Sequence, residues 1–363
     1  MSTKHVKNEK DIMTHKEIDQ YHALALFSGG LDSILSIKTI QEQGLKVLGL
    51  HFCSPFFGNP QKLEHWEKVY GLDLLALDVS REYVQMLCSG PEFGLGKLLN
   101  PCIDCKIFML QKTRDLLDKY GAEFVISGEV LGQRPMSQRR DALFVILKEA
   151  GLKDLLLRPL SARHLPPTRA EREGLVDRGQ LQAISGRGRK EQMALARKYN
   201  ITEIPTPAGG CRLTDQESCK RYLPLLQHHR PGPEDFVLAN QGRQFWCESY
   251  WMTIGRDKQD NERIQEMVRD DDYMFWLKMH PGPTGLGRNI TGSPWPGKVL
   301  QSAAALVGHY SPRARKCLRK VDVTVQHKGE QTELSVWPGP DLEGLSWAEP
   351  VWDQDAARGL FAV

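Results

Sequence analysis

A six-residue loop, Ser28-Gly29-Gly30-Leu31-Asp32-Ser33, joins a short apolar run to a segment with helical spacing. The apolar run at residues 22–27 predicts a buried strand, and Ile34, Ile37 and Ile40 predict one face of a helix. Two adjacent glycines let backbone N–H groups turn toward a phosphate, and the start of a helix adds a favourable dipole. The sequence therefore predicts a phosphate-binding turn between a strand and a helix.

Asp32 is the informative member of this loop, because a carboxylate beside a phosphate needs a cation between them. We interpret it as a ligand of a Mg²⁺ ion that bridges the phosphates of ATP. Ser28 and Ser33 can donate hydroxyl hydrogen bonds to the nucleotide, and Gly29 and Gly30 supply the backbone freedom. An ordinary helix-capping turn is the plain alternative, since Ser and Asp are both good caps.

Predicted strands and helices alternate beyond the loop. Strands are expected at 46–51, 72–79 and 124–128, and helices at 33–43, 61–70, 105–119, 190–199 and 215–226. This alternation predicts an α/β fold in which a parallel sheet carries helices on both faces. Ligands of such sheets bind at the carboxyl ends of the strands, where the glycine-rich loop lies.

The chain divides by composition into four predicted parts. Residues 1–20 are charged and lack apolar periodicity, which predicts a mobile tail, and residues 21–227 hold the α/β pattern. The His- and Pro-rich segment 228–235 is a predicted linker. Residues 236–363 predict a smaller α+β domain with strands at 245–254, 274–279, 321–326 and 332–336 and one helix at 296–310.

No run approaches the roughly 20 apolar residues that would cross a bilayer, and the first twenty positions do not form a signal sequence. We therefore expect a cytoplasmic protein with no membrane partner. The net charge of +3 does not by itself indicate a nucleic-acid partner.

Three of the eight cysteines lie at predicted turns. Cys102 and Cys105 stand three positions apart where a helix begins, a place where the helix dipole lowers thiol pKa, and Cys211 follows a glycine-rich turn. Three thiolates can hold an iron–sulfur cluster with one open iron, whereas a closed structural zinc site needs a fourth ligand. The same three could instead form a persulfide carrier with a resolving partner. We interpret the remaining cysteines as buried and inert: Cys53, Cys88, Cys219, Cys247 and Cys317.

The loop and several other segments together resemble the PP-loop ATP pyrophosphatases that thiolate tRNA. The segments that carry this resemblance are residues 28–33, 100–106, 127–133, 158–161, 184–187 and 207–215. Residues 255–261 and 276–280 resemble, more weakly, the RNA-binding R domain of NFACT proteins. The resemblance implies a PP-loop (adenine nucleotide alpha hydrolase-like) sheet, with Gly128 helping to enclose an adenylate, followed by an NFACT-R-like domain.

By resemblance, the chain would be an ATP-dependent tRNA sulfurtransferase. It would adenylate a uridine carbonyl oxygen and replace that oxygen with sulfur, releasing AMP and pyrophosphate. Asp32, Cys102, Cys105 and Cys211 would be the catalytic residues, and the three cysteines would hold a 4Fe–4S cluster or carry a persulfide. The expected partners are tRNA and a sulfur donor, either a cysteine desulfurase or inorganic sulfide.

Two other functions remain open at this stage. One is a PP-loop enzyme that sulfurates or amidates a small molecule, and the other is a non-catalytic RNA-binding protein that senses ATP. RNA contacts are expected from the Arg-rich residues 134–197 or from the C-terminal domain, although a solvated basic surface and a set of core aromatics explain the same residues. The C-terminal candidates are Tyr250, Trp251, Arg256, Trp276, Lys278, His280 and Arg288.

Overall fold

The computed structural model describes residues 20–205, 210–342 and 344–361. It divides into two compact units, one ending at Thr214 and the other beginning at Asp215. Each unit has a hydrophobic core of its own. The predicted mobile tail lies outside the described residues, apart from Gln20.

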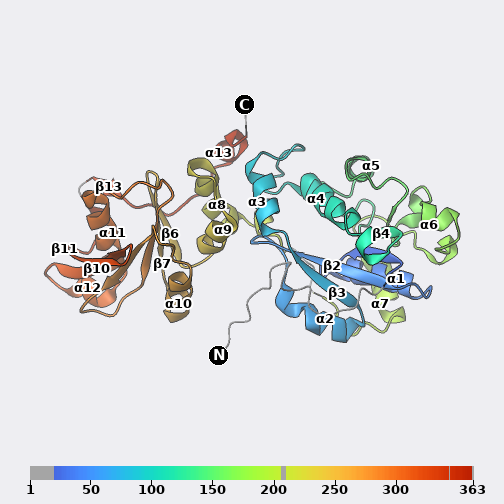
Figure 1. The fold of residues 1–363 in the computed structure, drawn as a ribbon, viewed down its shortest axis with the longest axis horizontal. Helices are drawn as coiled ribbons and strands as arrows, with labels where there is room; N and C mark the ends of the chain where they lie inside the picture. The colour runs from blue at the N-terminus through green and yellow to red at the C-terminus, as the bar shows by residue number, and fades with distance from the viewer. Residues whose placement is uncertain (1–19, 206–209, 343, 362–363) are drawn as a thin grey trace. The chain divides into compact units, whose positions relative to one another are not determined.

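The first unit is built on a five-stranded parallel sheet with strand order β3-β2-β1-β4-β5. Strands β2, β3 and β4 of this sheet are labelled in Figure 1. The central strand β1 pairs with β2 on one side and with β4 on the other, so the strand order reverses beside β1. Such a reversal leaves the loops at the carboxyl ends of the two neighbouring strands free to diverge around a ligand. The strands span Ala23–Leu26 (β1), Val47–Cys53 (β2), Asp73–Asp78 (β3), Phe124–Ser127 (β4) and Leu156–Leu157 (β5).

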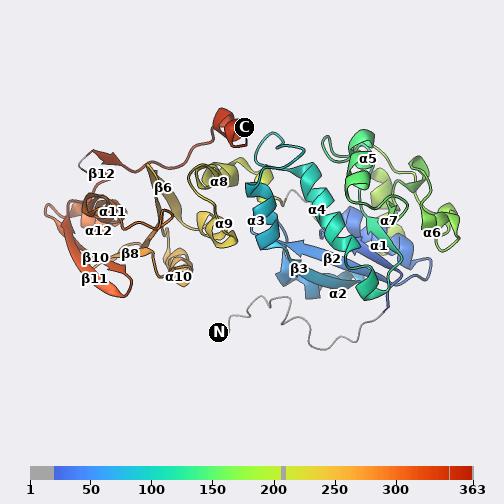
Figure 2. The same cartoon turned by 45° about the horizontal axis from the view of Figure 1, so that its top comes forward.

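Helices cover both faces of this sheet (Figure 2). Ala23, Ala25 and Phe27 share one core cluster with residues of α1, α2 and α7, whereas the alternate residues Leu24 and Leu26 are buried outside that cluster. Helix α4 packs against β1 and α5. The helices are α1 (Leu31–Gln41), α2 (Leu63–Tyr70), α3 (Ser80–Cys88), α4 (Cys102–Arg114), α5 (Arg140–Glu149), α6 (Arg169–Arg172) and α7 (Lys190–Lys198).

The second unit contains a six-stranded antiparallel sheet with strand order β11-β10-β8-β9-β7-β6. Its strands are β6 (Arg243–Cys247), β7 (Tyr250–Ile254), β8 (Tyr273–Leu277), β9 (Gly285–Arg288), β10 (Val321–His327) and β11 (Glu330–Val336), and β12 (Asp341–Leu342) and β13 (Leu345–Ser346) form a separate pair. Its helices are α8 (Gln216–His228), α9 (Pro233–Ala239), α10 (Lys258–Glu266), α11 (Gly297–His309), α12 (Pro312–Lys316) and α13 (Gln354–Gly359). The predicted fold class, a parallel α/β sheet followed by a smaller α+β domain, is confirmed.

Two details differ from the sequence-based expectations. Residues 245–254 form a hairpin rather than one strand, because Glu248 adopts a left-handed backbone with φ of 53° between β6 and β7. Residues 228–235, predicted as a linker, lie inside the second unit. There the Tyr222 ring of α8 packs edge-on against Phe236 of α9, and its hydroxyl donates to Asn240. Within the described ranges, no helix is both long and apolar enough to cross a membrane.

Candidate active site

The glycine-rich loop connects β1 to α1 at the carboxyl edge of the first sheet. The Ser33 hydroxyl donates to the carbonyl oxygen of Gly30 at 2.7 Å, and the Gly30 N–H donates to the Ser28 hydroxyl at 3.3 Å. The backbone of Gly29 has a φ of +76°, a value that residues other than glycine rarely adopt. Gly30 is the N-cap of α1, and no described side chain accepts from the first turn there, so the plain helix-capping alternative does not describe this loop.

Asp32 sits in the first turn of α1 with its carboxylate largely buried. Burial raises its pKa above the ordinary value, against the lowering effects of Gln133, Arg189 and Arg134. One of its oxygens, Oδ1, is fully buried and accepts no hydrogen bond of good geometry within the described residues. A buried carboxylate oxygen without a donor is costly unless a ligand supplies the missing charge, and a cation bridging bound phosphates would do so. The residues present therefore fit Mg²⁺ and ATP.

An aromatic cluster supports the loop from beneath. The His51 ring shares a hydrogen bond of 3.0 Å with the Phe27 carbonyl through Nδ1, and its Nε2 accepts from the Asn59 N–H at 2.8 Å. These two contacts require a neutral ring with the proton on Nδ1, and burial lowers the pKa of His51 in the same direction. Trp66 packs against both the Phe27 and His51 rings and lies directly over Gly29, where an added Cβ would stand 2.6 Å from the indole.

Gly128 follows β4 and lies against the backbone of the loop. A Cβ placed on Gly128 would stand 2.8 Å from the carbonyl carbon and oxygen of Asp32 and from the Cα of Ser33. Because backbone atoms cannot move aside cheaply, this position accepts only glycine at the observed separation. The ends of β1 and β4 therefore pack together where the strand order reverses.

Glu129, the next residue, is the centre of a buried ion cluster. Its carboxylate lies 3.1 Å from Arg158 Nε and 4.0 Å from Lys106 Nζ, and Glu129 and Arg158 are both almost fully buried. Burial raises the pKa of Glu129, but the charges of Lys106 and Arg158 outweigh it, and the net pKa is lowered. Three of the sequence segments that carried the resemblance, 100–106, 127–133 and 158–161, thus meet at one carboxylate.

Ser161 joins two further segments to the same region. Its hydroxyl donates to the carbonyl of Ile184 at 2.7 Å and accepts from the N–H of Leu131 at 3.0 Å. The Gly186 N–H donates to the Leu131 carbonyl at 2.7 Å. These contacts hold 127–133 beside 184–187, and they place Gln133 and Arg189 within electrostatic reach of Asp32.

The three predicted cysteines gather around the side chain of Tyr83 in α3. Tyr83 is fully buried, and its pKa is raised by burial first and then by the nearby thiols of Cys105, Cys211 and Cys102. Its hydroxyl makes no hydrogen bond of good geometry within the described residues. The rings of Phe56, Phe57 and Phe108 surround it at centroid distances of 4.8 to 5.8 Å.

The backbone next to Cys211 is held beside Phe56, because the Arg212 N–H donates to the Phe56 carbonyl at 2.9 Å. Phe56 in turn packs against Tyr83. Cys102 and Cys105 lie one turn apart at the start of α4. Asn100 donates its side-chain amide to the Cys102 sulfur at 3.1 Å, and Asp104 accepts from the N–H groups of Glu92 and Phe93. The structure therefore brings the three thiols to one centre.

The pKa of Cys105 does not follow the sequence-based expectation. Burial of its thiol raises the pKa above the ordinary value, although the Tyr83 hydroxyl and Lys106 act in the opposite direction. Desolvation disfavours a thiolate more than one helix terminus favours it.

The structure does not confirm a metal cluster at the thiols. Across the described ranges, which include all three cysteines, no three His, Cys, Asp or Glu side chains are arranged to hold a metal ion. The iron–sulfur cluster is therefore not confirmed.

The expected RNA-contacting residues divide between surface and interior. Trp251 and Arg288 are almost fully buried, so both belong to the core of the second unit rather than to a stacking surface. In the Arg-rich stretch, Arg158 is buried against Glu129, and Arg178 and Arg172 pair with Glu171 and Asp154. These three arginines therefore pair with acidic side chains of the same unit.

Sequence reasoning missed several residues that shape the site: His51, Trp66, Tyr83, Glu129 and Gln133. Glu129 and Gln133 stood within a quoted segment but had been given no role. His51 lies in a predicted strand and Trp66 in a predicted helix, whereas Tyr83 lies in α3, which was not predicted. Only the fold brings these three side chains to the loop or the cysteines.

Two family models match parts of this chain. Residues 19–164 match the family model described as thiamine biosynthesis protein (ThiI), and residues 242–348 match the NFACT protein RNA binding domain. The chain joins a ThiI-type PP-loop segment to an NFACT-R-type segment. Cys102 and Cys105 lie inside the ThiI-type segment, whereas Cys211 lies beyond its end.

Curated relatives match part of the chain. A tRNA-specific 2-thiouridylase MnmA of Petrotoga mobilis is 29% identical over 129 residues, which cover 30% of this chain and 35% of the relative. A probable tRNA sulfurtransferase of Methanobrevibacter smithii is 24% identical over 143 residues, 35% of this chain and 37% of the relative. The chain thus spans little more than a third of the length of these relatives.

Among solved structures, a predicted subunit of tRNA methyltransferase from Methanocaldococcus jannaschii is 16% identical with a TM-score of 0.28, covering 37% of this chain and 66% of that one. This structural likeness is too low to carry an argument. The assignment of the ThiI-type and NFACT-R-type segments comes from the family models.

Proposed function

We propose that this chain is an ATP-dependent tRNA sulfurtransferase of the PP-loop type. The observation that carries the proposal is a continuous series of contacts between the two reactive centres. Asp32 packs against Gly128, Glu129 follows Gly128 and pairs with Lys106, and Lys106 follows Cys105 in α4. A nucleotide site and a thiol centre joined in this way support a reaction in which activation by ATP precedes sulfur transfer.

In the first step, a uridine carbonyl oxygen of the tRNA attacks the α-phosphate of ATP. The new O–P bond forms as the bond to pyrophosphate breaks, which gives an adenylated base. Ser28, Gly29, Gly30 and Ser33 would surround the phosphates, and Asp32 would hold a Mg²⁺ ion that, when bound, would neutralise charge on the phosphate oxygens. Trp66 and His51 keep the loop in shape from beneath.

In the second step, sulfur replaces the activated oxygen. A persulfide on one of the three cysteines attacks the base carbon with its outer sulfur, and AMP leaves with the electron pair of the broken C–O bond. A second thiol of the centre then attacks the inner sulfur, forming a disulfide as the S–S bond to the transferred sulfur breaks. An external thiol reduces this disulfide, and a sulfur donor, a cysteine desulfurase or inorganic sulfide with an oxidant, reloads the persulfide.

The three thiols could act through a persulfide, as in the second step above, or through an iron–sulfur cluster. Iron analysis after anaerobic reconstitution separates the two routes. The thiol route predicts a colourless active protein, whereas activity that follows bound iron would establish the cluster.

The substrate class follows from the second unit. An NFACT-R-type segment in the same chain supports an RNA substrate, and the ThiI-type segment and the thiouridylase relatives support tRNA. A small-molecule substrate would give the second unit no role.

The experiment that tests the nucleotide step replaces Asp32 with Asn, which keeps the size of the side chain but removes its charge. Pyrophosphate release with ATP, Mg²⁺ and tRNA should fall by about a hundredfold or more, because the cation loses its protein ligand. The matched control is Asp118→Asn, a change at an exposed aspartate of the same unit. Equal release by Asp32→Asn and the control would refute the assignment of the loop.

A further inference from the structure

The second unit contains a pocket of about 80 Å³ whose lining is mainly cationic. Four basic side chains converge on it from three parts of the unit: α8, the start of β6 and the turn after β7. Glu349 is the single acidic residue of the lining. The complete lining is Lys220, Arg221, Gly242, Arg243, Gln244, Arg256, Glu349 and Pro350.

Two of these cations are held in place without a carboxylate. Arg221 donates from Nη1 to the carbonyls of Ala239 at 3.1 Å and Gly242 at 3.4 Å, and Arg243 donates from Nη1 to the carbonyl of Gly255 at 3.2 Å. The Arg243 guanidinium also lies 4.8 Å from the centroid of the Tyr310 ring. Neither Arg221 nor Arg243 forms an ion pair with another described residue; the neighbouring ion pairs involve Lys220 and Arg256 instead. Backbone carbonyls and a ring therefore orient both guanidinium groups and leave their charge for another anion.

The other two cations are paired, but each keeps donors that can turn to a ligand. Lys220 contacts the exposed Glu217 at 2.6 Å, and Arg256 contacts Asp260 at 2.6 Å. Burial lowers the pKa of Arg221, and the charge of Arg256 lowers it further, against the raising effects of Glu217, Tyr222 and Glu349. A half-buried guanidinium that is repelled by its neighbour gains from any anion that enters the pocket.

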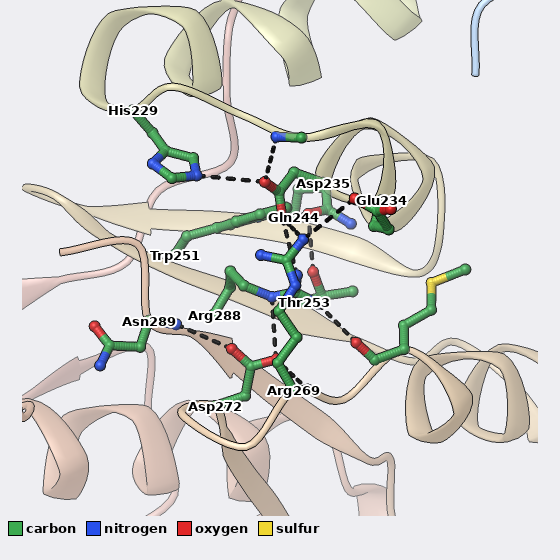
Figure 3. A network of polar contacts seen from close by, with 12 residues as sticks. His229, Glu234, Asp235, Gln244, Trp251, Thr253, Arg269, Asp272, Arg288 and Asn289 are labelled. Atoms are coloured by element: carbon green, nitrogen blue, oxygen red, sulfur yellow. Dashed lines mark hydrogen bonds and ion pairs between the residues drawn. The ribbon is translucent and has the colours of Figure 1, made fainter. Parts of the chain in front are cut away.

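A buried polar network fixes the elements that carry the pocket (Figure 3). Arg288 Nη1 lies 2.9 Å from Asp235 Oδ1, and its Nε lies 3.1 Å from Asp272 Oδ2, with all three side chains 1% exposed. Asp235 also accepts from the Gly232 N–H, which ties the turn between α8 and α9 to the sheet. Gln244, which lines the pocket, accepts from Trp251 Nε1 at 2.7 Å and from the Thr253 hydroxyl at 3.0 Å. The pocket is thus preorganised.

We propose that this pocket binds a backbone phosphate of RNA, with Arg221 and Arg243 as its principal donors. Arginine presents planar, paired donors that match the oxygens of a phosphodiester, and phosphate contacts position a protein on RNA without reading its sequence. Arg221 lies in α8, before the NFACT-R-type segment that begins at residue 242, whereas Arg243 lies inside that segment. The inference rests on the proposed function, which supplies RNA as the partner.

The test measures the affinity of the full chain for a fluorescent tRNA transcript across a range of salt concentrations. Arg221→Ala and Arg243→Ala should each weaken binding about tenfold, and each should reduce the slope of log affinity against log salt by about one unit. Arg319→Ala, which removes an exposed cation of the same unit outside the pocket, should change neither quantity. If the pocket variants bind like Arg319→Ala while the wild type binds tRNA, the pocket assignment is wrong and the proposed function stands.

A second variant avoids any loss of folding. Glu349 is exposed, so Glu349→Gln removes one negative charge at the rim and should tighten tRNA binding about twofold to threefold. An unchanged or weaker affinity for this variant would count against the pocket. If the wild type itself does not bind tRNA, the RNA partner of the proposed function fails as well.

Competition identifies the source of the phosphate. Inorganic phosphate should displace tRNA only as strongly as chloride at matched ionic strength, because a single small anion lacks the neighbouring contacts of a polymer. Displacement by inorganic phosphate far below that ionic strength would make this a small-anion site and overturn the RNA interpretation.

Discussion

At the scale of single residues, Tyr83 is the side chain that changes the description of the thiol centre most. Its hydroxyl is buried beside thiols from two distant parts of the chain, and it lowers the pKa of Cys105 against the effect of burial. The sequence signals Cys102, Cys105 and Cys211 through their turns, but Tyr83 lies on a helix that was not predicted, and its place among the thiols depends on the fold.

Tyr83→Phe removes that hydroxyl and should raise the pKa of Cys105 further. The rate of alkylation of Cys105 by iodoacetamide should therefore move to higher pH, with about a threefold lower rate at pH 8, because only the thiolate reacts. Peptide mass spectrometry of the labelled protein across pH 6 to 10 measures this profile.

The control is Tyr70→Phe, which removes a hydroxyl that donates to the Glu203 carbonyl away from the thiols. That change should leave the Cys105 profile where it is. A Tyr83→Phe profile that coincides with the wild type would show that the hydroxyl does not act on the thiol.

At the scale of elements, the strands and helices that flank the phosphate loop were predictable because their apolar spacing is regular. Strand β9 was not predicted, since its sequence Gly285-Leu-Gly-Arg288 has little side chain to show a pattern. Its glycines are required by packing, as a Cβ at Gly285 would stand 2.6 Å from Val307 and one at Gly287 would stand 2.5 Å from Trp295. Helix α3 was likewise missed, and with it Tyr83.

The meeting of β1 and β4 provides the prediction at this scale. Gly128→Ala should push the end of β4 away from Asp32 and Ser33, destabilise the protein by about 1–3 kcal/mol and weaken ATP binding. Thermal unfolding with and without ATP and Mg²⁺ measures both effects.

Gly188→Ala is the matched control, because an added Cβ there meets no atom within 4 Å. It should leave both the melting temperature and its increase with ATP near the wild-type values. A Gly128→Ala protein with wild-type ATP stabilisation would mean that the close approach of β4 does not shape the nucleotide site.

At the scale of the whole molecule, one chain joins a unit with a ThiI-type family match to a second unit that matches the NFACT protein RNA binding domain. The order of these units could be read from the sequence. The convergence of the quoted segments on Glu129 and Ser161 could not, because it depends on which strands are neighbours in the sheet.

The most direct test of sulfur transfer is nucleoside mass spectrometry of tRNA incubated with the purified protein, ATP, Mg²⁺ and a sulfur donor. We expect a thiouridine whose formation requires ATP and is accompanied by AMP and pyrophosphate. Cys211→Ser should keep ATP binding but lose the thiouridine, whereas Cys317→Ser in the second unit should keep both. An undiminished thiouridine yield from Cys211→Ser would refute the role of Cys211. No thiouridine from the wild type with any donor would refute sulfur transfer by this chain.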